Sequence, residues 1–411
     1  MLRSMFSAIS GLRAHQTKMD VTGNNIANVN TVGFKASQTV FQDTLSQVIR
    51  AGGGPAADRG GTNPAQVGLG AKVAAITTNW TQGATQSTGR SEDFMIEGDG
   101  FFVTRGTGGE QLFTRAGSFS FDAGGRLVTP DGAFLQGWMA GADGAVNPNN
   151  PVGNLSVPIG QLVDPSATTA GAVKGNLPSD APVGTSLQTA TVMFDSQGVS
   201  QQIAYAVTKT AANTWDVTVS HPTAGVLQTV TGVTFGPDGK MTSAAPPPFN
   251  PNAVLPAGRF PSWDNDVQID ISQLTQYGSA GEIGDGGQDG YAVGSLQSFQ
   301  LGADGTIMGT YSNELKQPIG RLALASFNNP GGLEKAGNSS FRVGVNSGAA
   351  QVGPAGAGGR GELVSGALEM SNVDLAEEFT GLIVAQRGFQ ANSRVITSSD
   401  EILQDLVNLK R

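Results

Sequence analysis

The stretch LAEEFTGLIVAQRGFQANSRVITSSDEILQDLV, residues 375–407, forms a regular helical pattern near the end of the chain. The residues of one face are separated by alternating steps of four and three, which is the a/d spacing of a coiled coil. This face consists of Leu375, Phe379, Leu382, Gln386, Phe389, Ser393, Ile396, Asp400, Leu403 and Val407. Asp374, three residues before Glu377, resembles the first residue of a capping box. The sequence therefore predicts a long C-terminal helix with one continuous seam.

A second seam with the same spacing lies at the other end of the chain. Its positions are Leu2, Met5, Ile9, Leu12, Gln16 and Met19. A single amphipathic helix packed on a globular core is the alternative explanation for either seam. Because the two seams match in spacing, we predict that the terminal helices pair with each other as one coiled-coil domain. Gln16, Gln386 and Asp400 are polar, so the pairing is expected to be weak in a free chain.

The middle of the chain has the composition of turn-rich β structure. Glycine accounts for 59 of the 411 residues, and Asp-Gly steps between apolar runs favour hairpin turns. Strands are predicted over 94–97, 101–104, 191–194, 203–208, 215–219, 226–235 and 321–327. No helical run separates these strands, so a parallel βαβ sheet is not expected. We predict a mainly β fold with long terminal helices, and two irregular tracts at 50–64 and 237–261.

Charge and residue types exclude several classes of function. The chain has 24 basic and 33 acidic residues, a net charge of −9, which argues against nucleic acid and an anionic membrane as partners. It contains no cysteine, so disulfides, thiol nucleophiles and cysteine metal sites are ruled out. No stretch approaches the roughly 20 apolar residues of a membrane span, and the first residues do not resemble a cleaved signal peptide.

No motif predicts a catalytic, cofactor-binding or metal-binding site. Gly98-Asp99-Gly100 is interpreted as a hairpin turn, because no helix follows it as a phosphate loop would require. The acidic segment GEIGDGGQDG, residues 281–290, lacks the spacing of a calcium-binding loop. A Ser-His-Asp triad would have to use one of the two histidines, His15 and His221, and both are expected at the surface. We therefore predict that the protein is not an enzyme and needs no cofactor.

Three long segments resemble the signatures of one family. NNIANVNTVGFKAS, residues 24–37, resembles the N-terminal signature of bacterial flagellar rod and hook proteins. The pattern GxxQxTGxxxDFMIEGDGFF, residues 83–102, is similar to the next signature of that family. LEMSNVDLAEEFTGLIVAQRGFQANSRVI, residues 368–396, is similar to its C-terminal signature. The large β-rich insertion between the two halves resembles the hook branch of the family, whose rod members are typically shorter.

The resemblance implies a nested architecture. An inner helical domain is expected from an N-terminal helix at 1–33 and a C-terminal helix at 363–411, with a connector at 34–71. A first β domain is expected in two pieces, 72–145 and 289–362, with a second β domain, 146–288, inserted between them.

The same resemblance implies a structural subunit that polymerises into a curved, flexible tube and transmits motor torque to the filament. The expected assembly interface contains seam positions and three residues of the first signature: Leu2, Met5, Ile9, Leu12, Met19, Ile26, Asn28, Phe34, Leu375, Phe379, Leu382, Gln386, Phe389, Ile396, Leu403 and Val407. Its implied partners are further copies of the chain, the flagellar rod, the hook cap, the hook–filament junction proteins and the type III export apparatus. The implied location is the extracellular flagellum. A distal rod protein and a secreted β-rich adhesin are the alternatives.

Overall fold

A computed structural model describes residues 2–55, 60–141, 144–157, 160, 162–251, 263 and 265–408. The chain divides into two compact units. The first consists of Met1–Val157, Phe299–Met308 and Pro318–Arg411, and the second of Pro158–Ser298 and Gly309–Gln317. In the described part of the chain, no helix is long and apolar enough to cross a membrane.

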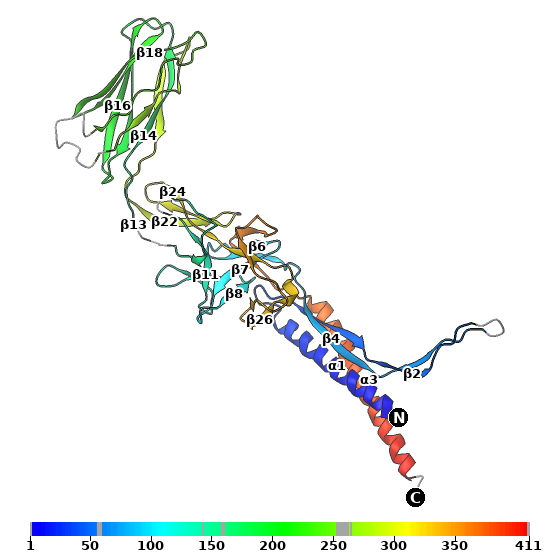
Figure 1. The fold of residues 1–411 in the computed structure, drawn as a ribbon. Coiled ribbons are helices and arrows are strands. Elements are labelled where there is room, and N and C mark those ends of the chain that lie inside the picture. The colour runs from blue at the N-terminus through cyan, green and yellow to red at the C-terminus, as the bar shows by residue number, and fades with distance from the viewer. Residues whose placement is uncertain are drawn as a thin grey trace. The chain divides into compact units, whose positions relative to one another are not determined.

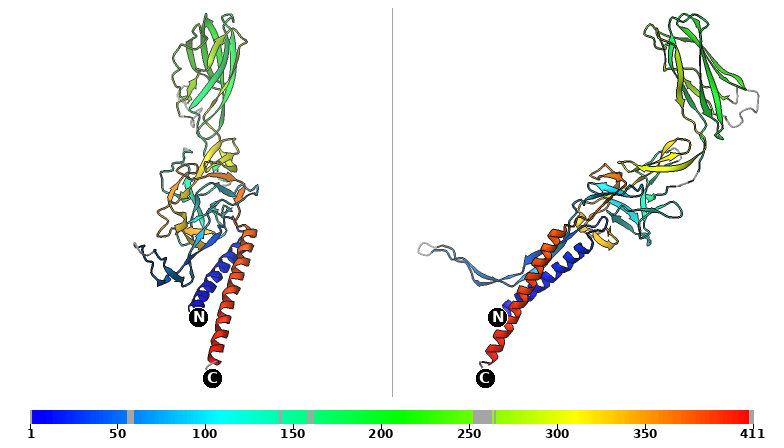
Figure 2. Two further views of the ribbon diagram at one scale, coloured as in Figure 1. Left: turned by 90° about the vertical axis from the view of Figure 1, so that its right-hand side faces the viewer. Right: turned by 180° about the vertical axis from the view of Figure 1, so that it is seen from behind.

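Two helices from the two ends of the chain belong to the first unit. α1 spans Leu2–Ala27 and α3 spans Leu375–Asn408. They lie side by side (Figure 1), and two further views show the same pairing (Figure 2). The predicted pairing of the terminal helices is therefore confirmed. Asp374 Oδ1 accepts hydrogen bonds from the backbone N–H groups of Ala376 and Glu377, at 2.8 and 3.3 Å, and so caps α3.

A two-stranded antiparallel ribbon follows α1. β1 (Ser37–Asp43) pairs with β4 (Ala71–Thr78), and β2 (Ser46–Arg50) pairs with β3 (Ala65–Gly68). The hydrogen bond from Thr44 N to Gly70 O, 2.9 Å long, joins the two pairs. The segment predicted as a connector thus contains extended β structure. Of the tract 50–64, Ala56–Arg59 lie outside the described residues, and the remainder carries one isolated bridge, between Gly53 and Thr62.

The β structure of the first unit is built from both halves of the chain. β7 (Phe101–Arg105) pairs with β8 (Gln111–Thr114) and β11 (Phe134–Met139) from the first half. It also pairs with β25 (Leu324–Ser326) from the second half. The buried core between these strands consists of Phe101, Val103, Phe113, Trp138, Ala323, Ala325, Phe327 and Phe341. The rings of Phe113 and Phe327 meet edge to face, with centroids 4.9 Å apart.

Short strands complete the first unit. They are β5 (Thr85–Ser87), β6 (Phe94–Glu97), β9 (Ser120–Phe121), β10 (Leu127–Val128), β12 (Gly153–Asn154), β26 (Glu334–Gly337), β27 (Ser340–Arg342), β28 (Gln351–Gly353), β29 (Glu362–Ser365) and β30 (Ala367–Glu369), with a 3₁₀ turn, η1, at Pro330–Gly332. Three further strands, β22 (Gly294–Leu301), β23 (Thr306–Tyr311) and β24 (Lys316–Leu322), contain the boundaries at which the chain passes from one unit to the other.

The second unit has two sheets and a core of its own. One sheet is an antiparallel meander of β15 (Ser186–Phe194), β16 (Ser200–Ala211), β17 (Thr214–His221) and β18 (Gly225–Thr234). The other is built on β14 (Ala170–Pro178), which pairs with β19 (Gln268–Asp270), β20 (Leu274–Tyr277) and β21 (Glu282–Gln288); β13 spans Leu162–Val163. Buried side chains of both sheets meet in a single cluster that includes Tyr205, Trp215, Val217, Trp263 and Ile269. An independent core of this kind is what a separately folding unit requires.

The predicted fold class, mainly β with long terminal helices, is confirmed. Each predicted strand corresponds to a strand of the structure, although 226–235 is shifted by one residue and 321–327 is divided between β24 and β25. Two pairs of β14 are parallel, those with β19 and β20, but the meander lies between the paired strands in the chain. Residues 252–262, within the predicted irregular tract 237–261, lie outside the described residues.

Candidate assembly surfaces

α1 and α3 run antiparallel and approach each other closely at two glycines. Asn392 lies over Gly11, where an added Cβ would be 2.8 Å from Asn392 Nδ2. His15 lies over Gly388, where an added Cβ would be 2.5 Å from His15 Nε2. Each glycine therefore accommodates the larger side chain of the facing helix, and a Cβ at either position would require that side chain to move or the helices to separate.

His15 is partly buried between the helix pair and the ribbon, rather than freely exposed at the surface as predicted. Its ring meets Phe41 of β1 edge to face, with the centroids 5.8 Å apart. Burial, with a smaller effect of the Lys18 charge, lowers the pKa of His15. His221 is also buried rather than exposed, and its Nε2 lies 3.3 Å from Gln201 Oε1. The sequence shows the seam of α1 but not the ribbon that covers another side of the helix.

The structure brings together only some of the predicted interface residues. Those that are partly buried on the helices are Met5, Ile9, Leu12, Met19, Ile26, Leu382, Phe389, Ile396 and Leu403. Leu375, Phe379 and Gln386 are exposed, and the side chains of Leu2 and Val407 lie outside the described part. The buried positions of α1 are instead small or polar: Ala8, Ala14, Thr22 and Asn25. Those of α3 are Ala385 and Ser399. Within one chain, small residues thus make the close helix contact.

α3 also carries apolar side chains that the described chain leaves 40–57% exposed. We call them the outer stripe, which includes two sides of the helix: Leu375, Phe379 and Ile383 on one, and Val384, Val395 and Ile402 on the other. Phe379 is 50% exposed and Ile383 is 57% exposed. A helix on the surface of a globular protein normally keeps its apolar residues on one side. Apolar residues on two sides of α3 indicate a helix with a second packing partner.

The ribbon is a second exposed apolar surface. Its exposed members are Val40, Phe41, Leu45, Val48, Ile49, Val67, Leu69 and Ile76. Leu45 is 84% exposed. Gly70, with φ of +124°, lets the ribbon approach α1, and Ala71 N donates a hydrogen bond of 3.2 Å to Ser10 Oγ there. A two-stranded ribbon is only marginally stable alone in water, so the part beyond β1 and β4 needs a further partner.

Phe34 and Asn28, both predicted interface residues, line a groove of about 420 Å³ at the end of α1. Lys335 of β26 lies over the ring of Phe34, 5.3 Å from its centroid, and donates a hydrogen bond of 2.9 Å to Ser37 Oγ. Asn28 Nδ2 donates to Asn24 O at 2.9 Å, which closes the last turn of the helix. These two residues therefore hold the end of α1 in place within the chain.

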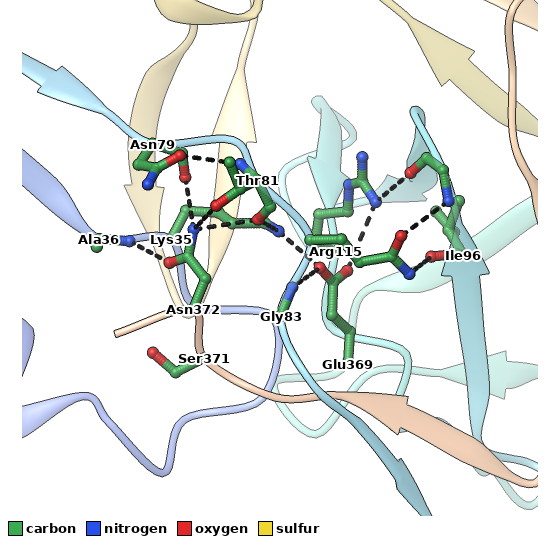
Figure 3. A network of polar contacts seen from close by, with 12 residues as sticks. Lys35, Ala36, Asn79, Thr81, Gly83, Ile96, Arg115, Glu369, Ser371 and Asn372 are labelled. Atoms are coloured by element: carbon green, nitrogen blue, oxygen red, sulfur yellow. Dashed lines mark hydrogen bonds and ion pairs between the residues drawn. The ribbon is translucent and has the colours of Figure 1, made fainter. Parts of the chain in front are cut away.

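A buried ionic cluster lies where both terminal segments enter the β structure (Figure 3). Lys35 Nζ is 2.6 Å from Glu369 Oε1, and both side chains are fully buried. Arg115 Nη1 is 3.5 Å from the other carboxylate oxygen and donates a hydrogen bond of 2.8 Å to Gly98 O. Burial lowers the pKa of Lys35, and the carboxylate of Glu369 opposes that change. We call Lys35, Arg115 and Glu369 the ionic clasp.

The acidic segment that the sequence offered as a calcium loop takes part in hydrogen bonds within the second unit. The acidic segment 281–290 forms β21, where Asp285 accepts a hydrogen bond from Thr191 Oγ1 at 2.8 Å. Asp289 accepts hydrogen bonds from the backbone N–H groups of Thr169 and Ala170, each at 2.9 Å. The described chain holds no group of three or more metal-ligating side chains.

Four family models match successive parts of the chain. They are described as Flagella basal body rod protein (residues 5–35), Flagellar hook protein FlgE/F/G D1 domain (95–175), Flagellar basal body protein FlaE D2 domain (163–291) and Flagellar basal body rod FlgEFG protein C-terminal (364–409). The first and last models cover the two paired helices. Together these matches indicate an axial protein of the bacterial flagellum.

Full-length relatives narrow this class. The flagellar hook protein FlgE of Borreliella burgdorferi is 38% identical over 100% of both chains, and that of Escherichia coli is 35% identical over 98% of this chain and 99% of its own. The flagellar basal-body rod protein FlgG of Bacillus subtilis is 34% identical over 100% of both chains. The crystal structure of Helicobacter pylori flagellar hook protein FlgE2 gives a TM-score of 0.49 at 14% identity, over 62% of this chain and 93% of that one. The chain belongs to the flagellar hook protein family. It is a structural subunit of the extracellular hook.

Proposed function

We propose that copies of this chain assemble into a curved, flexible tube that transmits motor torque to the filament. The observation that carries this proposal is the presence of two separate exposed apolar surfaces in the first unit, the outer stripe of α3 and the ribbon. Two different surfaces on one chain allow each copy to bind its neighbours through a heterologous contact. When the rotation between neighbouring copies does not close into a ring, such a contact generates a helical polymer.

The terminal helices are the part of the subunit best suited to line the tube. Most of the predicted interface residues lie on them, and Leu375 and Phe379 are exposed in a single chain. Their burial between neighbours would remove apolar surface from water, at about 25 cal/mol per Å². The second unit, with its separate core, is free to form the outer surface. Its contacts with other copies would then set how the tube bends.

The family membership suggests further partners for the ends of the tube. These are the flagellar rod, the hook cap and the hook–filament junction proteins, with the type III apparatus as the route of export. We propose that, at each end of the tube, these partners cover the outer stripe and the ribbon through apolar contacts like those between copies of the chain. The net charge of −9 and the absence of a basic face fit a protein partner better than nucleic acid or an anionic membrane.

A straight rod is the second candidate. The full-length similarity to a basal-body rod protein, at 34% identity, favours it, because that relative has nearly the same length as this chain. Electron microscopy of polymers grown from the purified chain distinguishes the two. Curved tubes support the hook, straight tubes support the rod, and a chain that never polymerises at high concentration contradicts both.

A further inference from the structure

The ionic clasp draws its three members from separate parts of the chain. Lys35 lies in the segment that follows α1, Glu369 closes β30 just before α3, and Arg115 follows β8. Lys35 and Glu369 are 334 residues apart in sequence. Figure 3 shows the side chains of all three converging on one point of the β structure. The clasp therefore joins two segments, the one that follows α1 and the one that precedes α3, to the same place in the first unit. We call these two segments the roots of the helices.

Backbone groups also bind the charged atoms of Lys35 and Glu369. Lys35 Nζ donates a second hydrogen bond to Thr81 O at 2.7 Å, and Gly83 N donates one to Glu369 Oε1 at 3.0 Å. Gly33 N donates to the backbone oxygen of Glu369 at 2.8 Å. The N-terminal and C-terminal segments thus touch each other directly as well as through the β strands.

Asn372 adds a second bridge between the same segments. Its Oδ1 accepts a hydrogen bond from Ala36 N at 2.8 Å, and its Nδ2 donates to Asn79 O and Thr81 O at 2.9 and 3.1 Å. Closer to the helices, Asn25 Nδ2 donates to Glu378 Oε1 at 2.6 Å and to Ser37 O at 2.8 Å. A change at one root is therefore transmitted to the other through side chains that both roots share.

The balance of charge in the clasp depends on which terminal segments are in place. The clasp contains two cations, Lys35 and Arg115, and a single anion, Glu369, with Lys35 and Glu369 fully buried and Arg115 3% exposed. A buried charge without its partner is strongly unfavourable, and buried ionic groups are best understood as fixing one arrangement rather than adding stability. If the C-terminal segment leaves, both cations lose their anion. If the N-terminal segment leaves, the Arg115–Glu369 pair remains balanced.

We propose that the ionic clasp is a lock that requires both ends of the chain. The β structure of the first unit holds either terminal segment firmly only when the other segment is in place. Glu369 is essential because it pairs with both cations. Lys35 links the N-terminal segment to the clasp. The lock fixes the adjoining ends of α1 and α3 at one place in the first unit. This proposal goes beyond the proposed function, and its test needs no polymer.

Hydrogen exchange on the full-length monomer tests the lock. In the Lys35→Met variant the Arg115–Glu369 pair stays balanced, so the chain is expected to fold. The lock predicts faster exchange at Ala36 N and Gly33 N in the same segment. It also predicts faster exchange at Met370 N, which belongs to the other terminal segment and donates to Ala84 O at 2.9 Å. Loss of one buried partner should raise exchange at these amides by about tenfold or more.

Glu369→Gln provides the converse test. It removes the carboxylate that both buried cations contact directly, so the same amides should exchange about a hundredfold faster, with Ala36 N affected although it is at the other end of the chain. Glu362→Gln is the matched control, because Glu362 is exposed on β29 and belongs to neither segment contact. It should leave all of these amides unchanged. If Glu369→Gln fails to fold, Lys35→Met decides alone. Faster exchange confined to the segment that carries the substitution, in a folded variant, would overturn the lock.

Discussion

Gly388 of α3 lies against the imidazole of His15 in α1, so closely that a Cβ on Gly388 would be 2.5 Å from His15 Nε2. The same helix contains Gly381, where an added Cβ would meet nothing within 4 Å. The two glycines therefore separate helix propensity from helix packing. One permits a close contact between the two ends of the chain, and the other only weakens the helix.

Gly388→Ala should loosen the α1–α3 pair, whereas Gly381→Ala should stabilise α3 by about 0.5–1 kcal/mol through helix propensity alone. The overlap at residue 388 requires His15 to move or the helices to separate. Circular dichroism and thermal melting of assembled tubes would measure both effects. Equal behaviour of the two variants would contradict the close contact of His15 with Gly388.

The helix pair should become less stable as the pH falls. The pKa of His15 in the folded chain is lower than its ordinary value of 6.5, so the unfolded chain binds more protons between those two values. The contribution of neutral His15 to stability is therefore complete above about pH 6.5 and is lost as the pH falls through the folded pKa. Melting of tubes between about pH 7.5 and pH 5 should show this slope. His15→Gln should reduce it, and an unchanged slope would show that other groups cause it.

The isolated monomer should have poorly protected terminal helices. Their mutual contact buries small side chains such as Ala8, Ala14 and Ala385, while Phe379 and Ile383 remain exposed. A pair with so little buried apolar surface gains most of its stability only when neighbours cover the rest. Hydrogen exchange should show rapid exchange within 2–27 and 375–408 in the monomer and slow exchange in tubes. Strong protection in a verified monomer would contradict this coupling.

The outer stripe of α3 should be required for assembly but not for folding. Phe379→Asp places a charge on a side chain that is 50% exposed in the single chain, so the melting of the β units should change by no more than about 0.5 kcal/mol. In a tube the same charge would be buried without a partner, which costs several kcal/mol. Sedimentation and electron microscopy should find monomer only. Glu377→Gln, two residues earlier and exposed, is the control that should still form tubes.

The second unit should control curvature rather than polymer formation. Ser166 and Tyr291 exchange backbone hydrogen bonds of 3.1 and 3.0 Å, so the chain enters and leaves most of this unit at nearly one point. Replacing 166–291 with a short Gly-Ser linker therefore removes its core without pulling the first unit apart. The variant should still form tubes, but straight ones, as seen by electron microscopy. Loss of all polymer from a variant whose first unit is folded would make the second unit an essential assembly contact.

Local patterns were enough to predict the two terminal helices and seven strand segments, but not the ribbon strands β1–β4. The heptad spacing of α3 and most Asp-Gly hairpins depend on neighbours in the sequence, and the structure confirms, for example, the hairpin that pairs Val128 with Phe134. The hairpin predicted at Gly98-Asp99-Gly100 is wrong, because β6 pairs with β29 and β7 pairs with β8, β11 and β25. The ionic clasp could not be predicted in this way, because Lys35 and Glu369 meet only after both halves of the first unit have folded. One signal was present, since Lys35 is the single charged residue between Asp20 and Asp43. An isolated charge in an uncharged run suggests a buried partner but does not say which one.

If copies of the chain assemble through the outer stripe of α3, neighbouring copies must cover it in the tube. The chain contains no cysteine, so Ile383→Cys places one thiol on this stripe at a position that is 57% exposed in the single chain. Val183→Cys, at a position 66% exposed in the second unit, is the control. We expect a maleimide to label both thiols rapidly in the monomer, and only the thiol at position 183 once tubes have formed. Rapid labelling of position 383 in intact tubes would contradict it.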